Sequence, residues 1–185
     1  MKSTQALKKL IYQNFEQEKF EENKILIFNA IKTKSITVLL LIESINFYYE
    51  KKKVLDAVEI SNFYLNHAGY NDEVLYQLLN ILIKKNQNKY VFELFKKNRK
   101  KIIFKGIFFL YAKFLININK PKIAKKYFLK SKGWLNDQDL KWNLYLCSKF
   151  EGSDQDAVNL ILQLIENERN SEKLHYFVLQ YLDHN

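Results

Sequence analysis

The segment AKKYFLKS, residues 124–131, places a small side chain first, a large apolar one fifth and a small polar one eighth. Similar segments begin at Ala57, Val91 and Ala157, and a weaker copy begins at Lys24. The pattern thus returns at a period of about 33 residues, which is typical of stacked helix pairs that bury their apolar faces only against their neighbours. The sequence therefore predicts a helical repeat array and favours binding over catalysis.

The composition supports a single helical-repeat domain over residues 1–185. With 48% hydrophobic residues, the chain can bury a sizeable core and is not a disordered tail. It has one proline and four glycines, too few for the turns of an all-β fold, so we expect an all-α protein. Cys147 is the sole cysteine, which excludes an intramolecular disulfide, and its apolar helical position predicts that it is buried.

We expect eleven helices, arranged as five antiparallel pairs and one last helix. The repeats span about residues 3–34, 35–68, 70–100, 102–134 and 136–168. The paired helices are expected at 3–19, 22–33, 36–50, 53–67, 71–85, 88–99, 102–118, 121–132, 136–150 and 154–168. The last helix, about 171–183, is predicted to cap the array, because a terminal unit must cover an exposed apolar face. Docking onto a partner is its alternative role.

Positive charge is concentrated in the middle of the chain. The formal net charge is +10, but residues 84–132 hold sixteen Lys or Arg against Glu93 alone, a net +15. Residues 133–185 hold four basic and nine acidic residues, a net −5. Such asymmetry can mark an anionic partner, such as an acidic protein or a nucleic acid. The candidate patch for an anionic partner is Lys96, Lys97, Arg99, Lys100, Lys101, Lys125 and Lys126.

A simpler origin of this charge is compositional drift. Of the 30 basic residues, 28 are Lys, and abundant Lys, Asn, Ile, Tyr and Phe fit drift toward A/T-rich codons. Only Arg99 and Arg169 offer the bidentate guanidinium group that base-specific recognition prefers. RNA binding through residues 84–132 is therefore the alternative function and not the first one.

The repeat resembles the tetratricopeptide repeat, a helix–turn–helix unit of about 34 residues. Ala57, Ala124 and Ala157 match the small residue near position 20 of that family, and Phe95 and Phe128 match the apolar residue four positions later. The sequence departs from the family in having large residues at position 8 of most repeats and no closing proline. The resemblance implies an α-solenoid, a tetratricopeptide-like superhelix. Another α-solenoid or an irregular helical bundle is the alternative.

The resemblance also implies where a partner binds. In that family the first helices line a concave groove, with positions 2, 5, 9 and 12 pointing into it. Position 5 reads Lys9, Ile42, Tyr76, Phe109 and Trp142, and position 9 reads Gln13, Asn46, Asn80, Lys113 and Leu146. The predicted groove residues are Asn46, Tyr49, Tyr76, Asn80, Phe109, Lys113 and Trp142. Asn at position 9 resembles the family's asparagine ladder, since an amide can both donate to and accept from a peptide backbone.

These groove assignments have alternatives. Aromatic residues at helical spacing are usually core, and Trp142 fits a packing position equally well if the repeat spacing shifts by one residue. Asn46 and Asn80 could also coincide by chance in a chain rich in Asn. Tyr76 and Asn80 are i, i+4 neighbours, so both lie on the same face of their helix.

No pattern in the sequence is typical of catalysis, a metal site or a cofactor. His67, His175 and His184 are scattered, and the glycines are isolated, which excludes a phosphate-binding loop. We therefore expect a protein that is not an enzyme and binds no metal or cofactor. The longest apolar runs are too short or too charged to span a bilayer, and Met1–Leu10 lacks the features of a secretory signal, so a cytoplasmic location is expected.

Three functions remain open at this point. The first is binding of a peptide or partner segment in the groove, as an adaptor, a scaffold subunit or a secretion-type chaperone. The second is RNA binding through the lysine-rich middle. The third is a structural subunit whose outer faces pack into a complex. Its basic middle could dock an acidic partner, or the acidic 133–185 region of one copy could pair with the basic middle of another and give head-to-tail oligomers.

Overall fold

The computed structural model describes residues 2–183; Met1, His184 and Asn185 lie outside the described residues. The described residues form eleven α-helices. They are α1 (Lys2–Glu16), α2 (Phe20–Lys32), α3 (Val38–Glu50), α4 (Val54–His67), α5 (Asp72–Lys84), α6 (Asn88–Asn98), α7 (Lys105–Asn117), α8 (Pro121–Lys130), α9 (Asp137–Glu151), α10 (Asp154–Asn167) and α11 (Ser171–Leu182). Each lies close to its predicted bounds, and the all-α prediction is confirmed.

Local sequence explains where several helices begin and end. The side chain of Asn71 accepts a hydrogen bond from the Val74 amide at 3.0 Å, which satisfies one of the free N–H groups at the start of α5. Pro121 is the first residue of α8, where its missing N–H costs nothing. Gly152 ends α9 with a φ of 72°, in the left-handed region that glycine adopts without strain.

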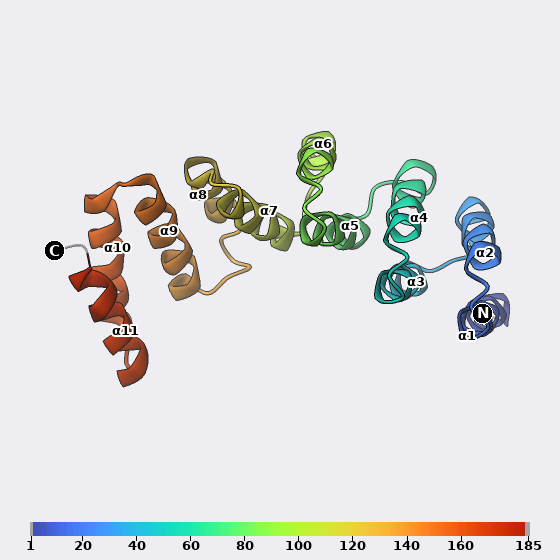
Figure 1. Cartoon of the computed structure of the whole chain (residues 1–185), viewed down its shortest axis with the longest axis horizontal. Coiled ribbons are helices and arrows are strands. Elements are labelled where there is room, and N and C mark those ends of the chain that lie inside the picture. Colours follow the sequence, from blue (N-terminus) through green and yellow to red (C-terminus); the bar gives the residue numbers. More distant parts are fainter. Residues whose placement is uncertain (1, 184–185) are drawn as a thin grey trace. The chain divides into compact units, whose positions relative to one another are not determined.

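The helices form two compact units, residues 1–102 and residues 103–185. In unit 1, α1, α3 and α5 make one layer and α2, α4 and α6 make the other (Figure 1). Helix α3 packs on α5 within the first layer, α2 packs on α4 within the second, and α4 contacts both α3 and α5 across the layers. In unit 2, each helix from α7 to α11 packs on the next. Both arrangements are stacks of antiparallel helix pairs.

The turn inside each pair has the same conformation in all five pairs. It contains one residue with φ between 54° and 72°, and these residues are Glu18, Lys52, Asn86, Asn119 and Gly152. In each turn the next amide reaches back to a carbonyl five positions earlier, as Gln87 N–H does to Leu82 at 2.9 Å. This is a Schellman turn, which satisfies carbonyls at a helix end. The turns inside the pairs recur with the period of the side-chain pattern.

The turns correct the register of the first repeat by one position. Asn23 follows the turn at Glu18 by the same interval that separates Ala57 from the turn at Lys52. Helix α2 accordingly buries Asn23, which donates to the Ile11 carbonyl at 3.2 Å, whereas Lys24 is only half-buried. The copy placed at Lys24 was wrong because residues 25–28 are all apolar, so spacing alone does not show which of them face the core.

The same correction applies to α1. Lys8 and Tyr12, and not Lys9 and Gln13, occupy positions 5 and 9, and Ile11 at position 8 is fully buried. In the later repeats the packing positions lie in the core at their original register, since Tyr48 and Leu79 are also fully buried.

Each unit buries a side chain that carries a polar group, Tyr48 in unit 1 and Cys147 in unit 2. The hydroxyl of Tyr48 donates to the Phe20 carbonyl at 2.6 Å, which ties α3 to the start of α2. Burial raises the pKa of the Cys147 thiol to about 12, so this side chain is a buried, unreactive small residue, as predicted.

Helix α11 covers the last helix pair of unit 2. Phe177 is buried and belongs to the same hydrophobic cluster as Tyr145 and Ile161. The side-chain oxygen of Gln180 accepts hydrogen bonds from the Tyr145 hydroxyl at 3.2 Å and from Lys149 Nζ at 3.1 Å. Apolar packing and these polar contacts together hold α11 as a cap against α9 and α10.

Candidate partner-binding surface

The candidate surface in unit 1 lies on its first layer of helices. Positions 5, 9 and 12 of α3 and α5 are half-buried there, whereas the packing positions between them are fully buried. We call these six residues the first-helix face. They are Ile42, Asn46, Tyr49, Tyr76, Asn80 and Ile83. Side chains at these positions remain accessible on helices that are fixed by the core behind them.

The amides of Asn46 and Asn80 occupy the same register position on two packed helices. Within residues 2–183, neither side chain has a hydrogen bond, an ion pair or a ring contact to another residue. An Asn side chain offers two donors and one acceptor, the same groups that an extended peptide backbone needs. The two residues can therefore bind main-chain groups of a partner without giving up a contact of their own.

One end of the first-helix face carries positive charge beside an aromatic ring. The Nζ atoms of Lys84 and Lys85 lie 5.9 and 5.7 Å from the centroid of the Tyr49 ring. A cation over a ring at such distances is attracted by its negative face. Neither lysine was among the predicted groove residues. The signal was their separation of about one repeat from Tyr49, which places the end of α5 beside the end of α3.

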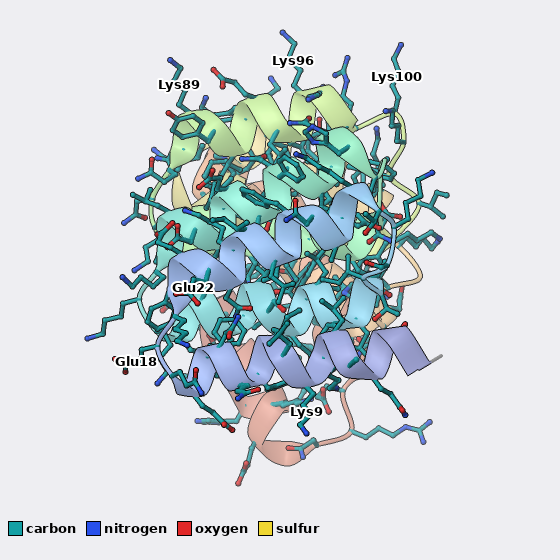
Figure 2. The ribbon with its side chains drawn as sticks, turned by 90° about the vertical axis from the view of Figure 1, so that its right-hand side faces the viewer. Lys9, Glu18, Glu22, Lys89, Lys96 and Lys100 are labelled. Atoms are coloured by element: carbon teal, nitrogen blue, oxygen red, sulfur yellow. The ribbon has the colours of Figure 1, made fainter. Side chains whose placement is uncertain are left out.

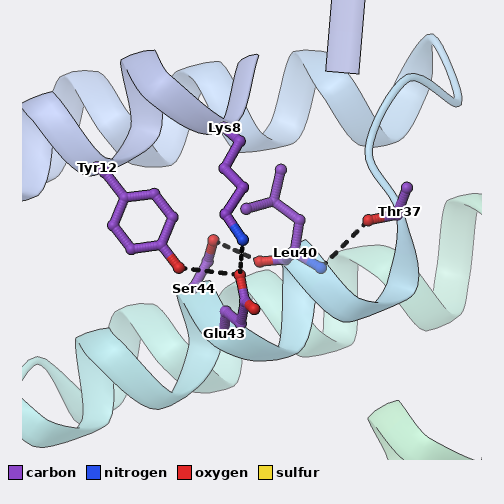
Figure 3. Close-up of polar contacts among 6 residues, drawn as sticks. All are labelled: Lys8, Tyr12, Thr37, Leu40, Glu43 and Ser44. Carbon is purple, nitrogen blue, oxygen red and sulfur yellow. Dashed lines mark hydrogen bonds and ion pairs between the residues drawn. The ribbon is translucent and has the colours of Figure 1, made fainter. Parts of the chain in front are cut away.

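The corresponding residues of α1 are already engaged. Lys8 Nζ and the Tyr12 hydroxyl both donate to Glu43 Oε2, at 3.2 and 2.9 Å (Figure 3). The hydrogen bond from Tyr12 and the charge of Lys8 lower the pKa of the Glu43 carboxyl, and the same hydrogen bond raises the pKa of Tyr12. Position 9 thus carries a hydrogen-bonded side chain in the first repeat, whereas Asn46 and Asn80 hold this position in the next two without a hydrogen bond to another described residue.

The other predicted groove residues lie in unit 2 and have different surroundings. Phe109 is half-buried, with its ring 5.9 Å from that of Phe128, and Lys113 is exposed. The Trp142 ring lies 5.5 and 5.6 Å from the rings of Tyr176 and Phe177 on α11. Trp142 therefore packs between α9 and the capping helix.

The candidate anionic-partner patch is also divided between the units. In unit 1, Lys96, Lys97, Arg99, Lys100 and Lys101 are exposed, and Lys96 and Lys100 project outward (Figure 2). In unit 2, Lys126 is exposed, but Lys125 Nζ lies 3.1 Å from the carboxylate of Asp156. This ion pair offsets part of the positive charge of α8. No observation supports the RNA-binding alternative.

The described residues were also compared with the requirements of a metal site and a membrane span. No group of three or more His, Cys, Asp or Glu side chains between residues 2 and 183 is placed to hold a metal ion. None of the eleven described helices has both the length and the apolar character needed to cross a bilayer.

Comparison with known proteins identifies the fold. No protein-family model and no curated protein sequence matches the chain. Solved structures do match, although their sequences differ widely. The structure titled "Crystal structure of MamA protein" superposes with a TM-score of 0.66 at 12% identity, over 92% of this chain and 94% of that one.

Two further structures agree with this comparison. YrrB, described as a TPR protein with an unusual peptide-binding site, gives a TM-score of 0.61 at 14% identity, over 92% of this chain and 89% of that one. PilW, described as a type IV pilus biogenesis factor, gives 0.57 at 15% identity, over 96% of this chain and 99% of that one. The chain has a tetratricopeptide-like repeat fold. The resemblance inferred from Ala57, Ala124 and Ala157 is thereby confirmed at the level of fold.

Proposed function

We propose that the protein is a non-catalytic protein–protein interaction module that binds a peptide or partner segment along the first-helix face. The observation that carries this proposal is the pair of unbonded amides, Asn46 and Asn80, at equivalent positions of adjacent helices. Tyr12, at the equivalent position of α1, is hydrogen-bonded to Glu43, so bonded and unbonded side chains at this position occur within unit 1. A bound segment that covers these amides must supply hydrogen bonds to them, because a buried amide without a partner costs free energy.

The bound segment is extended, with its backbone hydrogen-bonded to Asn46 and Asn80. Such contacts read no particular side chain, because every residue except proline offers the same N–H and C=O groups. Apolar contact with Tyr49 and Tyr76 supplies most of the binding free energy, since rigid aromatic side chains bury large areas at low entropic cost.

Charge gives the segment a preferred orientation. Lys84 and Lys85 lie at the end of the face marked by Tyr49. An acidic residue or a terminal carboxylate of the segment is favoured at that end, which raises the association rate and selects against basic segments. In unit 2, Phe109 and Lys113 are proposed as further contacts. Trp142 is not included, because its ring packs against α11.

A module of this kind can act as an adaptor, a scaffold subunit or a secretion-type chaperone. These roles differ in how long the partner stays bound. Co-purification from the native cell at a fixed ratio through several columns supports a scaffold subunit, whereas release upon assembly or export of the partner supports a chaperone.

Paired substitutions test the face itself. Tyr76→Ala/Asn80→Ala should abolish capture of the native partner in a pull-down while the thermal unfolding temperature changes little. Lys9→Ala/Gln13→Ala is the matched control, because these exposed α1 residues lie outside the corrected register. Undiminished capture by Tyr76→Ala/Asn80→Ala would refute the proposal.

A further inference from the structure

The second layer of unit 1 contains a hollow between α4 and α6. Its volume is about 700 Å³, and the last turn of α5 forms part of its lining. The apolar lining residues are Val54, Leu55, Val58, Ile81, Leu82, Tyr90 and Leu94. Leu55 is 84% exposed and Tyr90 is 58% exposed, so two large side chains of this lining are in contact with water. None of the six residues of the first-helix face lines this hollow, although Lys85 lies beside both.

The neighbouring seam between α2 and α4 is closed by side chains at fixed repeat positions. Lys24 Nζ lies 2.7 Å from Asp56 Oδ1 and 3.3 Å from Glu59 Oε2. The rings of Phe28 and Phe63 stack 4.3 Å apart in the same seam. An ion pair and an aromatic pair therefore join α2 to α4.

The equivalent positions of the next repeat lack these contacts. Val58 stands in the place of Lys24, Tyr90 in the place of Asp56, and Asn62 and Lys97 in the places of Phe28 and Phe63. All four of these side chains line the hollow. Near the ends of the helices, Lys97 Nζ donates to Asn66 Oδ1 at 3.3 Å, which joins α4 to α6 there.

The ion pair returns in unit 2, which shows that it belongs to the repeat. Lys125 on α8 and Asp156 on α10 hold the same positions as Lys24 and Asp56, and their charged atoms are 3.1 Å apart. The seam between α4 and α6 has apolar side chains, Val58 and Tyr90, where the α2–α4 and α8–α10 seams have a salt bridge. Exposed apolar surface lowers solubility unless it is covered by a partner.

We propose that this seam binds an amphipathic segment of another protein, with large apolar side chains along one side and carboxylates beside them. The lining of α4 runs from Val54 to Asn62, about 12 Å along the helix, which matches about two turns of a bound helix. Apolar residues at i, i+4 and i+7 of the segment would contact Leu55, Val58 and Leu94.

Charge complementarity indicates that the polar residues of the bound segment are acidic. Residues 84–101 hold eight Lys or Arg against Glu93 alone, and of these charged residues Lys85, Lys97 and Glu93 line the hollow. Lys89 and Lys96 project from α6 (Figure 2). Carboxylates flanking the apolar residues meet these cations, whereas a basic segment is repelled. The lysine-rich middle of the sequence thereby gains a role that requires no nucleic acid.

A fluorescent synthetic helix with leucines at i, i+4 and i+7 and glutamates at the other positions is the probe. Fluorescence anisotropy with the full chain should show saturable binding, and the same helix with lysines in place of glutamates should bind about tenfold more weakly or not at all. Equal affinity for the two helices, or no binding of the glutamate helix, would overturn the proposal.

Restoring the ion pair at this seam provides the decisive variant. Val58→Lys/Tyr90→Asp introduces a lysine and an aspartate at the repeat positions equivalent to those of Lys24 and Asp56. The new ion pair should close the hollow and weaken binding of the glutamate helix by about tenfold or more. Leu55→Ser, which removes an exposed lining side chain, should weaken it in the same direction. Ile25→Ser, an exposed apolar site on α2, is the matched control. Unchanged binding in both seam variants contradicts the proposal.

Two further outcomes separate this seam from other binding sites and occupants. Tyr76→Ala/Asn80→Ala should leave binding of the glutamate helix unchanged. Loss of binding in this variant would show that the helix binds to the first-helix face and would refute binding at the seam. Sedimentation of the wild-type chain tests a second copy as the occupant. Self-association that disappears in Val58→Lys/Tyr90→Asp would identify the occupant as another copy and overturn the choice of a different protein.

Discussion

The Nζ atom of Lys24 lies 2.7 Å from Oδ1 of Asp56, and both side chains are largely withdrawn from solvent, at 15% and 16% exposure. The equivalent pair in unit 2, Lys125 and Asp156, is 3.1 Å apart at 33% and 54% exposure. The two pairs occupy equivalent positions of the repeat but differ in their exposure to solvent. Because water and salt screen an exposed pair much more than a covered one, they contribute differently to stability.

Replacing Asp56 by Asn should therefore lower the free energy of unfolding by about 1.5–3 kcal/mol, the usual contribution of a hydrogen bond to a charged group. Asp156→Asn should cost about 0.5 kcal/mol or less, as should Glu21→Gln, whose carboxylate pairs with Lys24 from a largely exposed side chain. Urea unfolding at low salt measures all three. Equal losses for Asp56→Asn and Asp156→Asn would show that burial of the pair has no effect.

Removing the aromatic side chain of Phe177 should release α11. This ring is 6% exposed and packs against Trp142, so Phe177→Ala should cost about 3–5 kcal/mol of the stability of unit 2. Leu182→Ala, at an exposed position of the same helix, should cost about 0.5 kcal/mol or less. Hydrogen exchange of the α9 and α11 amides reports the change. Similar exchange in both variants would mean that α11 is not held by Phe177.

Tyr111 predicts how stability falls in alkaline solution. Burial, with a smaller effect of the neighbouring Tyr127, raises the pKa of Tyr111 to about 12, against about 10 in an unfolded chain. The pKa of Tyr111 is higher in the folded state than in the unfolded chain. Its contribution to the free energy of unfolding is therefore complete below about pH 10 and is lost as the pH rises toward 12.

The Tyr111→Phe variant cannot ionise at this position. Its stability relative to wild type should therefore improve by about 1 kcal/mol between about pH 9 and pH 11, measured by urea unfolding. Tyr90→Phe, which alters an exposed tyrosine, is the matched control. A constant difference between Tyr111→Phe and wild type across that range would contradict the expected linkage.

The pKa of Glu43 is shifted in the opposite direction to that of Tyr111. Its pKa is lowered by the Tyr12 hydrogen bond and by Lys8, so its contribution is present above about pH 4.3 and is lost as the pH falls through the folded-state pKa. Glu43→Gln should cost about 0.5 kcal/mol at neutral pH, a small value because the pair is solvent-accessible, and nothing in strong acid. Thermal unfolding at the two pH values checks this, and an equal cost at both would be inconsistent with ionisation.

The helices were predictable because small and apolar residues recur at a period that one sequence shows directly. Ala57, Val91, Ala124 and Ala157 are all fully buried, as that period requires. The first repeat was misplaced by one position because the apolar residues of α2 are consecutive, and only the turn at Glu18 fixes its register. Local patterns thus indicated the elements, while the backbone turns were needed for their alignment.

The surfaces were less predictable because they depend on contacts between helices. The contact of the half-buried Trp142 ring with Phe177 depends on the position of α11, which the repeat spacing does not show. The seam between α4 and α6 depends on pairs of residues about one repeat apart, such as Lys24 with Asp56 and Val58 with Tyr90. Comparing those pairs across repeats would have indicated the missing ion pair, whereas the hollow itself required the structure.

Site-specific photo-cross-linking in the native cell tests most directly whether a partner segment lies on the first-helix face. A benzophenone side chain in place of Tyr76 should form a covalent adduct with one partner, and mass spectrometry should map it to a short stretch of that protein. The same group in place of Phe150, an exposed aromatic residue at the end of α9, should form none. An adduct of equal yield at both positions, or none at Tyr76 with a partner that still co-purifies, would contradict binding at this face.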